Sequence, residues 1–193
     1  MRLPLSLGIA LGFAPYIAFF IGMRLASAEA GLWAALVVAI VNAGRDRVAG
    51  GSTKLLEIGA ILLFAALAGF TAVTHWAWTV MSVRLAVDIG LLAIMLVSLA
   101  VGQPFTVQYA RERVAEEVWR TPLFAQVNRR ITLAWALAFA ILVAAHAAVV
   151  FDPSVPIWAD IAVSIVALAA AVRFSTWYPG FARRKAGAAS RSG

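Results

Sequence analysis

Residues 131–150 read ITLAWALAFAILVAAHAAVV, a run of twenty residues without aspartate, glutamate, lysine or arginine. An apolar run of about 20 residues is long enough to cross the hydrocarbon core of a bilayer as a helix. Further apolar runs occur at residues 3–23, 26–41, 58–73, 80–102 and 157–174. Because lipid offers no hydrogen-bond partners to an open strand, these runs predict an all-α polytopic membrane protein with six transmembrane helices.

The composition of the whole chain agrees with this class of protein. Of its 193 residues, 63% are hydrophobic and 13% are charged, whereas a soluble domain carries about 25% charged residues. Six spans of about 20 residues leave too little chain for a separate soluble domain. We therefore expect one membrane domain over residues 1–178, followed by a basic and disordered cytoplasmic tail over residues 179–193.

The basic residues predict the orientation of the chain. With six spans both termini share one side of the membrane, and fourteen of the sixteen lysines and arginines fall on that side. These are Arg2, Arg45, Arg47, Lys54, Arg111, Arg113, Arg120, Arg129, Arg130, Arg173, Arg183, Arg184, Lys185 and Arg191. The positive-inside rule then predicts a bacterial inner-membrane protein with both termini in the cytoplasm. Its basic loops would attract anionic lipids of the inner leaflet, and no nucleic-acid partner is expected.

The sequence offers little material for catalysis. It contains no cysteine and two histidines, which excludes disulfides and thiolate chemistry and leaves little scope for a metal site. It also lacks an HExxH pair, a glycine loop of the phosphate-binding type and a usable Ser–His–Asp spacing. We therefore expect no catalytic residues, no cofactor and no metal, in a protein that is not an enzyme.

Arg84 and Asp88 are the polar residues within a predicted span that most need an explanation. A charged side chain at mid-bilayer costs about 2.5–3.5 kcal/mol, and opposite charges four residues apart on one helix face partly neutralise each other. Together with His146 they form a candidate intramembrane polar site for a proton or an ion. In the alternative interpretation, Arg84 reaches the outer interface and Asp88 reaches up to it. Asp160 is expected to cap the sixth span, at the positive end of the helix dipole.

The longest polar segment, residues 103–130, carries apolar residues at roughly helical spacing. We expect residues 106–119 to form an amphipathic interfacial helix, with Val107, Val114 and Val118 turned toward the bundle or lipid, and Pro122 to end it. The polar face of this helix is a candidate surface for a protein partner or lipid headgroups; the alternative is a plain connector. The surface consists of Arg111, Arg113, Glu117, Trp119 and Arg120. Asn128 is a candidate N-cap of the fifth span.

Pairs of small residues four apart let helix backbones approach closely in a membrane. Such pairs are Gly8 with Gly12, Ala65 with Gly69, Ala134 with Ala138, and Ala167 with Ala171. They favour a compact bundle, and they are equally compatible with a homo-oligomer.

Several motif positions resemble one family of membrane proteins. These are Gln103-Pro104-Phe105, Trp119, and Asn128 leading into Trp135-Ala136-Leu137-Ala138-Phe139. In this combination the chain resembles the bacterial intracellular septation protein A family, or a related family of small polytopic inner-membrane proteins. The resemblance implies a role in cell division and envelope maintenance, exerted through membrane partners or lipid, and no catalytic residues. The alternative function is a small ion- or proton-coupled transporter or channel that uses the region of Arg84 and Asp88.

Overall fold

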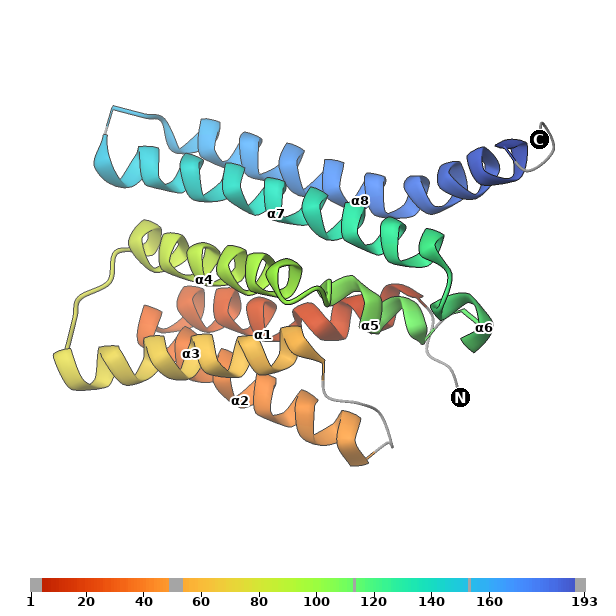
Figure 1. The fold of residues 1–193 in the computed structure, drawn as a ribbon. Coiled ribbons are helices and arrows are strands. Elements are labelled where there is room, and N and C mark those ends of the chain that lie inside the picture. The colour runs from red at the N-terminus through yellow and green to blue at the C-terminus, as the bar shows by residue number, and fades with distance from the viewer. Residues whose placement is uncertain (1–4, 49–53, 113, 153, 190–193) are drawn as a thin grey trace. The chain divides into compact units, whose positions relative to one another are not determined.

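The computed structural model describes residues 5–48, 54–112, 114–152 and 154–189, with side chains from Ala14 to Ala188 within these ranges. It is 88% helical, and the described residues contain no strand. The helices are α1 (Leu5–Leu25), α2 (Ala28–Val48), α3 (Leu55–Thr74), α4 (Val80–Ala100), α5 (Phe105–Arg111), α6 (Glu116–Trp119), α7 (Pro122–Phe151) and α8 (Ile157–Ala189) (Figure 1). The predicted all-α class is confirmed.

Five helices are long and apolar enough to cross a membrane, namely α2, α3, α4, α7 and α8. The remaining long helix, α1, has 21 residues, and its part with described side chains, Ala14–Leu25, is a shorter apolar stretch. Several long apolar helices are thus present, as predicted, whereas the number of six spans stays a prediction.

The helices group into two compact units, residues 1–94 and 95–193, with the boundary inside α4. In the first unit, Phe19 and Phe64 are fully buried, with ring centroids 6.0 Å apart. In the second unit, Phe139 and Leu142 of α7 are buried at 4% and 5% exposure. Each unit therefore has its own apolar core, and a single membrane domain over residues 1–178 stays a prediction.

A tight backbone crossing joins α1 to α2 in the first unit. The Ser27 hydroxyl accepts the Ala30 N–H at 3.0 Å and so begins α2. A Cβ atom built on Gly31 would lie 2.6 Å from the Phe19 carbonyl oxygen, and one built on Gly22 would lie 2.9 Å from the Gly31 Cα. Since the obstacles are backbone atoms, this crossing requires glycine.

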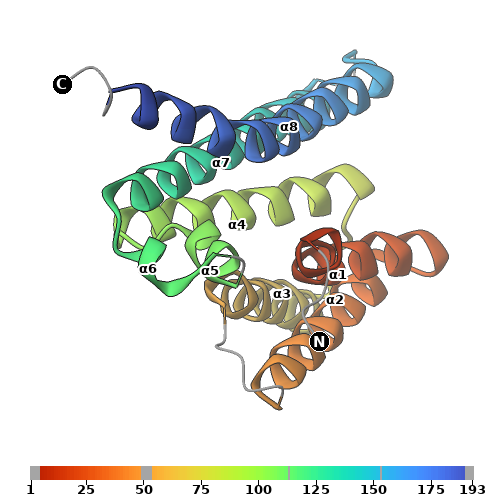
Figure 2. The same ribbon diagram turned by 90° about the vertical axis from the view of Figure 1, so that its right-hand side faces the viewer.

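None of the small-residue pairs predicted from sequence forms the close crossing of α1 and α2, which is made by Gly22 and Gly31. Gly8 and Gly12 lie outside the described side chains. A Cβ atom built on Gly69 of α3 would meet no atom within 4 Å, so no described helix approaches closely there. In the second unit, Ala167 and Ala171 of α8 are buried. There α7 and α8 pack side by side as a helical hairpin (Figures 1 and 2).

The expected single helix over residues 106–119 is wrong, because the segment forms two short helices, α5 and α6. Ala115 has an extended backbone with ψ of 151°, which interrupts the helix, and α6 begins directly after it with Glu116 and Glu117 in its first turn. Acidic residues favour a helix N-terminus, so the glutamates start a new helix. The location of this segment on the membrane surface stays a prediction.

The fifth apolar run belongs to a longer helix than expected, since α7 begins at Pro122 and not at residue 131. Thr121 caps it, its hydroxyl accepting the Phe124 N–H at 3.3 Å, and proline suits the first helical position because no N–H is needed there. Asn128 is therefore inside the helix, and its side-chain amide donates to the Phe124 carbonyl at 2.9 Å. The interpretation of Asn128 as an N-cap is wrong.

The last helix also exceeds its predicted length. Residues 157–174 were expected as a span and residues 179–193 as a disordered tail, yet α8 continues through Pro179 to Ala189. The expectation of disorder is thus wrong for residues 179–189. The residues after Tyr178 are rich in alanine and long basic side chains, which have high helix propensity.

The crossing of α1 and α2 leads to a stability prediction. Gly31→Ala should lower the stability of the protein by about 1–3 kcal/mol, the usual cost of forcing atoms into a filled space. Gly44→Ala, on the same helix but with nothing within 4 Å, should leave stability unchanged or raise it by up to about 1 kcal/mol. Thermal unfolding in detergent measures both, and equal melting temperatures would contradict the requirement for glycine.

Candidate functional site

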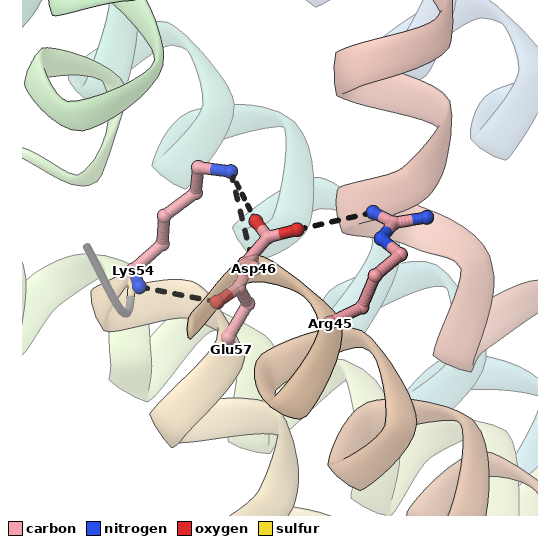
Figure 3. A network of polar contacts seen from close by, with 4 residues as sticks. All are labelled: Arg45, Asp46, Lys54 and Glu57. Atoms are coloured by element: carbon pink, nitrogen blue, oxygen red, sulfur yellow. Dashed lines mark hydrogen bonds and ion pairs between the residues drawn. The ribbon is translucent and has the colours of Figure 1, made fainter. Parts of the chain in front are cut away.

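A buried cluster of charges links the end of α2 to the start of α3 (Figure 3). The Lys54 ammonium nitrogen lies 2.8 Å from Asp46 Oδ2 and 3.6 Å from Glu57 Oε1. The Lys54 backbone N–H also donates to Glu57 Oε2 at 3.2 Å. Lys54 and Glu57 side chains are 9% and 8% exposed. At the rim, Arg45 donates to the other Asp46 oxygen at 3.1 Å, with 47% of its side chain exposed.

This cluster fixes the α2–α3 hairpin. Removing charges from water is costly unless they are paired with good geometry, and Lys54 meets this requirement by contacting two carboxylates from two helices. From the sequence, Lys54 was recognised only as one of the basic loop residues that predict the orientation of the chain. Asp46 and Lys54 are eight positions apart, across the inter-helix connection, so neither helical nor strand periodicity could have paired them.

Arg84 and Asp88 lie one turn apart on α4 in the first unit. Asp88 is buried, and Arg84 is half-buried. The Cζ atom of Arg84 lies 5.2 Å from the centroid of the Phe20 ring on α1, a cation–π geometry of the kind worth about 0.5–2 kcal/mol. Sequence reasoning missed this contact with Phe20. The mutual dependence of Arg84 and Asp88 stays a prediction.

His146, the third residue of the predicted intramembrane site, lies in the second unit and contacts Asp160 there. Its Nε2 atom is 3.4 Å from Asp160 Oδ2, and the two side chains are 3% and 1% exposed. Asp160 lies in the first turn of α8, as expected, and neither of its carboxylate oxygens accepts a hydrogen bond from a described residue; its stabilisation by the helix dipole stays a prediction. Asp160 is the fourth residue of α8, and its carboxylate lies against His146 of α7.

The His146–Asp160 pair has a definite chemical capability. A protonated imidazole at this distance would form an ion pair with the carboxylate, and ionisable residues inside a membrane mark functional sites by default. The Ser164 hydroxyl, one turn further along α8, is also buried without a hydrogen-bond partner among the described residues. Residues 146 and 160 come from different helices, so no local spacing in the sequence indicated the pairing.

The α5–α6 turn contains the predicted partner surface. The Cζ atom of Arg111, the last residue of α5, lies 5.4 Å from the centroid of the Trp119 ring at the end of α6. The Trp119 indole N–H donates to the Val114 carbonyl at 3.2 Å. Glu117 and Arg120 are exposed beside them. Of the predicted surface, the structure therefore brings Arg111 and Trp119 into contact, while Arg113 lies outside the described residues.

The first motif positions anchor α5 on its neighbours. Pro104 is buried and precedes α5. The Phe105 N–H donates to the Ser98 hydroxyl at 3.3 Å. The Thr106 hydroxyl donates to the Asn128 carbonyl at 3.0 Å. These hydrogen bonds tie α5 to the end of α4 and to α7.

Trp135 anchors the α7–α8 hairpin in a similar way. Its indole N–H donates to the Ser175 hydroxyl of α8 at 3.0 Å. The Ser175 hydroxyl in turn donates to the Ala171 carbonyl at 2.8 Å. A buried indole requires a hydrogen-bond partner, and Ser175 provides it, so Trp135 has a clear role in packing.

No protein-family model, curated protein or solved structure matches this chain. The likeness to the septation protein A family therefore depends on the motif positions alone, among which Pro104, Asn128 and Trp135 make structural contacts.

The buried charge cluster leads to a second stability prediction. Lys54→Met should destabilise the protein by about 3–5 kcal/mol, because it leaves Asp46 and Glu57 close together without their shared cation. Arg45→Gln removes a charge from the exposed rim of the same cluster and should cost about 1 kcal/mol or less. Melting temperatures in the same detergent provide the comparison. A loss for Lys54→Met no greater than that for Arg45→Gln would show that the cluster does not stabilise the hairpin.

Proposed function

We propose that this protein is a non-enzymatic bacterial inner-membrane protein that acts in cell division or envelope maintenance through membrane partners or lipid. The observation that carries the proposal is the α5–α6 turn, where Arg111 lies over Trp119 beside exposed Glu117 and Arg120. Tryptophan and arginine contribute disproportionately to binding surfaces. The resemblance to the septation protein A family supplies the cellular context.

The turn is well suited to binding because its parts are held in place before a partner arrives. Trp119 is fixed by its hydrogen bond to Val114, and α5 is tied to α7 through Thr106. Ordering flexible side chains and loops on binding costs affinity. A turn that is already ordered avoids much of that cost. A segment that only connects two helices would not need this order.

The proposal includes a topology with six spans and both termini in the cytoplasm, in which α1 crosses the membrane in addition to α2, α3, α4, α7 and α8. Its support is the 21-residue length of α1 and the gathering of basic residues at alternate inter-helix connections. In this topology the α5–α6 turn faces the cytoplasm, where soluble division proteins and the anionic leaflet are both accessible.

Complementation of a gene deletion tests this function. In the bacterium that carries the gene, we expect deletion to change cell length or sensitivity to envelope stress, and the unaltered gene to restore both. Trp119→Ala combined with Arg111→Gln should fail to restore them because the surface of the turn is lost. Arg24→Gln, which removes an exposed charge at the end of α1, should restore both at equal membrane protein levels. A deletion without such a phenotype would contradict the proposal.

A second candidate is a small proton-coupled transporter, and the His146–Asp160 pair specifically favours it. The pair is buried between two long apolar helices, where charged groups cost several kcal/mol and are usually retained for function. In this second candidate the proton-binding residues are His146 and Asp160 of the second unit, and not Arg84 and Asp88 as predicted from the sequence. Asp88 is a further carboxylate, buried in the first unit.

Proton flux into liposomes separates the two candidates. A proton-sensitive dye inside the liposomes reports the flux. If the primary proposal is right, the flux into liposomes that contain the protein is no greater than the flux into empty liposomes. Transport would instead produce a flux that Asp160→Asn abolishes, because this change removes the proton-accepting carboxylate. Gly44→Ala should leave such a flux intact, since Gly44 has open space around it. Parallel measurements with Asp88→Asn show whether the buried carboxylate of the first unit takes part.

A further inference from the structure

The C-terminal part of α8 carries charge of a single sign. After Asp160 the chain contains no aspartate or glutamate. The same stretch has exposed basic residues at Arg173, Arg183, Arg184 and Lys185. Without acidic neighbours on their own helix, these side chains have no i,i+4 partner to neutralise them. The segment therefore presents a cationic surface.

Aromatic rings accompany the basic residues along this part of α8. Phe174 and Tyr178 are stacked with ring centroids 4.8 Å apart, and Trp177 and Phe181 are stacked at 4.9 Å. Trp177 is 50% exposed and Phe181 is 40% exposed. Exposed tryptophan and tyrosine beside basic residues are typical of the level of the lipid headgroups.

The length of α8 places this segment at that level. At 1.5 Å per residue, its 33 residues extend for about 50 Å, whereas the hydrocarbon core is about 30 Å thick. Arg173 lies about 24 Å along the helix from Ile157, and Arg183 about 39 Å. If the helix begins at one interface, the aromatic residues lie near the other interface and Arg183–Lys185 lie beyond it.

A shallow open groove of about 280 Å³ runs along the same helix surface. Its lining residues are Ala170, Arg173, Phe174 and Trp177. The lining is apolar except for Arg173, whose backbone lies about 6 Å inside the hydrocarbon edge and whose long side chain can reach the headgroups. An acyl chain beside a phosphate has the complementary character.

We propose that residues 173–185 of α8, the α8 basic segment, bind an anionic phospholipid. Arg183, Arg184 and Lys185 attract the phosphate and headgroup, and the long Arg173 side chain reaches toward the phosphate from about 6 Å deeper. An acyl chain runs inward along the groove from Trp177 past Phe174 toward Ala170. The Arg183 Nε donates to the Pro179 carbonyl at 3.2 Å, which holds this side chain close to the helix and the headgroup layer. The inference rests on the proposed function in assigning this end of α8 to the anionic inner leaflet, and it adds a lipid site distinct from the α5–α6 turn.

The test is native mass spectrometry of the full chain released from nanodiscs that contain equal amounts of phosphatidylglycerol and phosphatidylcholine. The unaltered protein should retain more phosphatidylglycerol than phosphatidylcholine. Each lysine or arginine near an anionic lipid surface raises the binding affinity about fivefold. The combined change Arg183→Gln, Arg184→Gln and Lys185→Gln should therefore reduce the preference at least fivefold, and so should Arg173→Gln alone.

A control with the same loss of charge combines Arg24→Gln, Arg129→Gln and Arg130→Gln, which are exposed and lie outside both the α5–α6 turn and the α8 basic segment, and it should keep the preference. If the control variant loses the preference for phosphatidylglycerol and the α8 variants keep it, the inference is overturned, while the proposed role of the α5–α6 turn stands. Equal losses in both would show non-specific attraction and would also overturn the inference, as would no preference in the unaltered protein. A dimer mass that disappears only in the α8 variants would identify a second copy of the chain as the occupant instead.

Melting temperatures of all variants in detergent keep the test interpretable. The substituted side chains of the α8 basic segment are exposed, so we expect these variants to unfold within a few degrees of the unaltered protein. Lipid preference lost at an unchanged melting temperature supports the site. If the α8 triple variant is unfolded, Arg173→Gln decides the result, and an unchanged preference in that variant overturns the site.

Discussion

Hydrocarbon offers no hydrogen-bond partner, so an ionisable side chain buried among these apolar helices needs an oppositely charged partner within the protein. Lys54 meets this constraint at the α2–α3 connection by contacting Asp46 and Glu57. His146 and Asp160 meet it at the α7–α8 connection. These contacts fix which helices form hairpins and in what register, whereas apolar side chains alone would tolerate several alternatives.

Close contacts between backbones add a second level of specificity. At Gly22 and Gly31 the backbones of α1 and α2 touch, and a methyl group would meet main-chain atoms. Elsewhere the helices are separated by side chains, as where Leu63 on α3 fills the space above Gly90 on α4. Close approach in a membrane increases van der Waals contact, which replaces the hydrophobic force that is missing between helices in lipid.

The second unit keeps its two kinds of chemistry at opposite ends of one helical hairpin. At one end, His146 and Asp160 lie beside the α7–α8 connection, removed from solvent. At the other end, α7 begins next to the α5–α6 turn, and α8 ends in aromatic and basic residues. Buried acid–base groups suit the binding of a proton, and exposed cations beside aromatic rings suit phosphate and interfacial lipid. The length of the helices separates these two kinds of side-chain chemistry.

The sequence by itself determined the all-α class and most of the long apolar helices, because a run of apolar residues meets the length requirement of a bilayer without reference to any other part of the chain. It also placed Arg111 and Trp119 on a candidate partner surface and His146 in a candidate polar site. Helix boundaries depended on weaker local signals. Pro122 by itself predicts the end of the preceding helix, whereas in the structure Thr121 and Pro122 are the cap and the first residue of α7.

Only the tertiary structure decided which polar side chains meet. Asp46 with Lys54, Phe20 with Arg84, and His146 with Asp160 are contacts between different helices. Their separation in sequence follows no helical period, because it depends on the length of a connection and on the relative rotation of two packed helices. The same reason explains why Asp160 reads as a cap in sequence yet faces a histidine in the fold: local spacing places a residue along its helix, and packing against a second helix determines its partner.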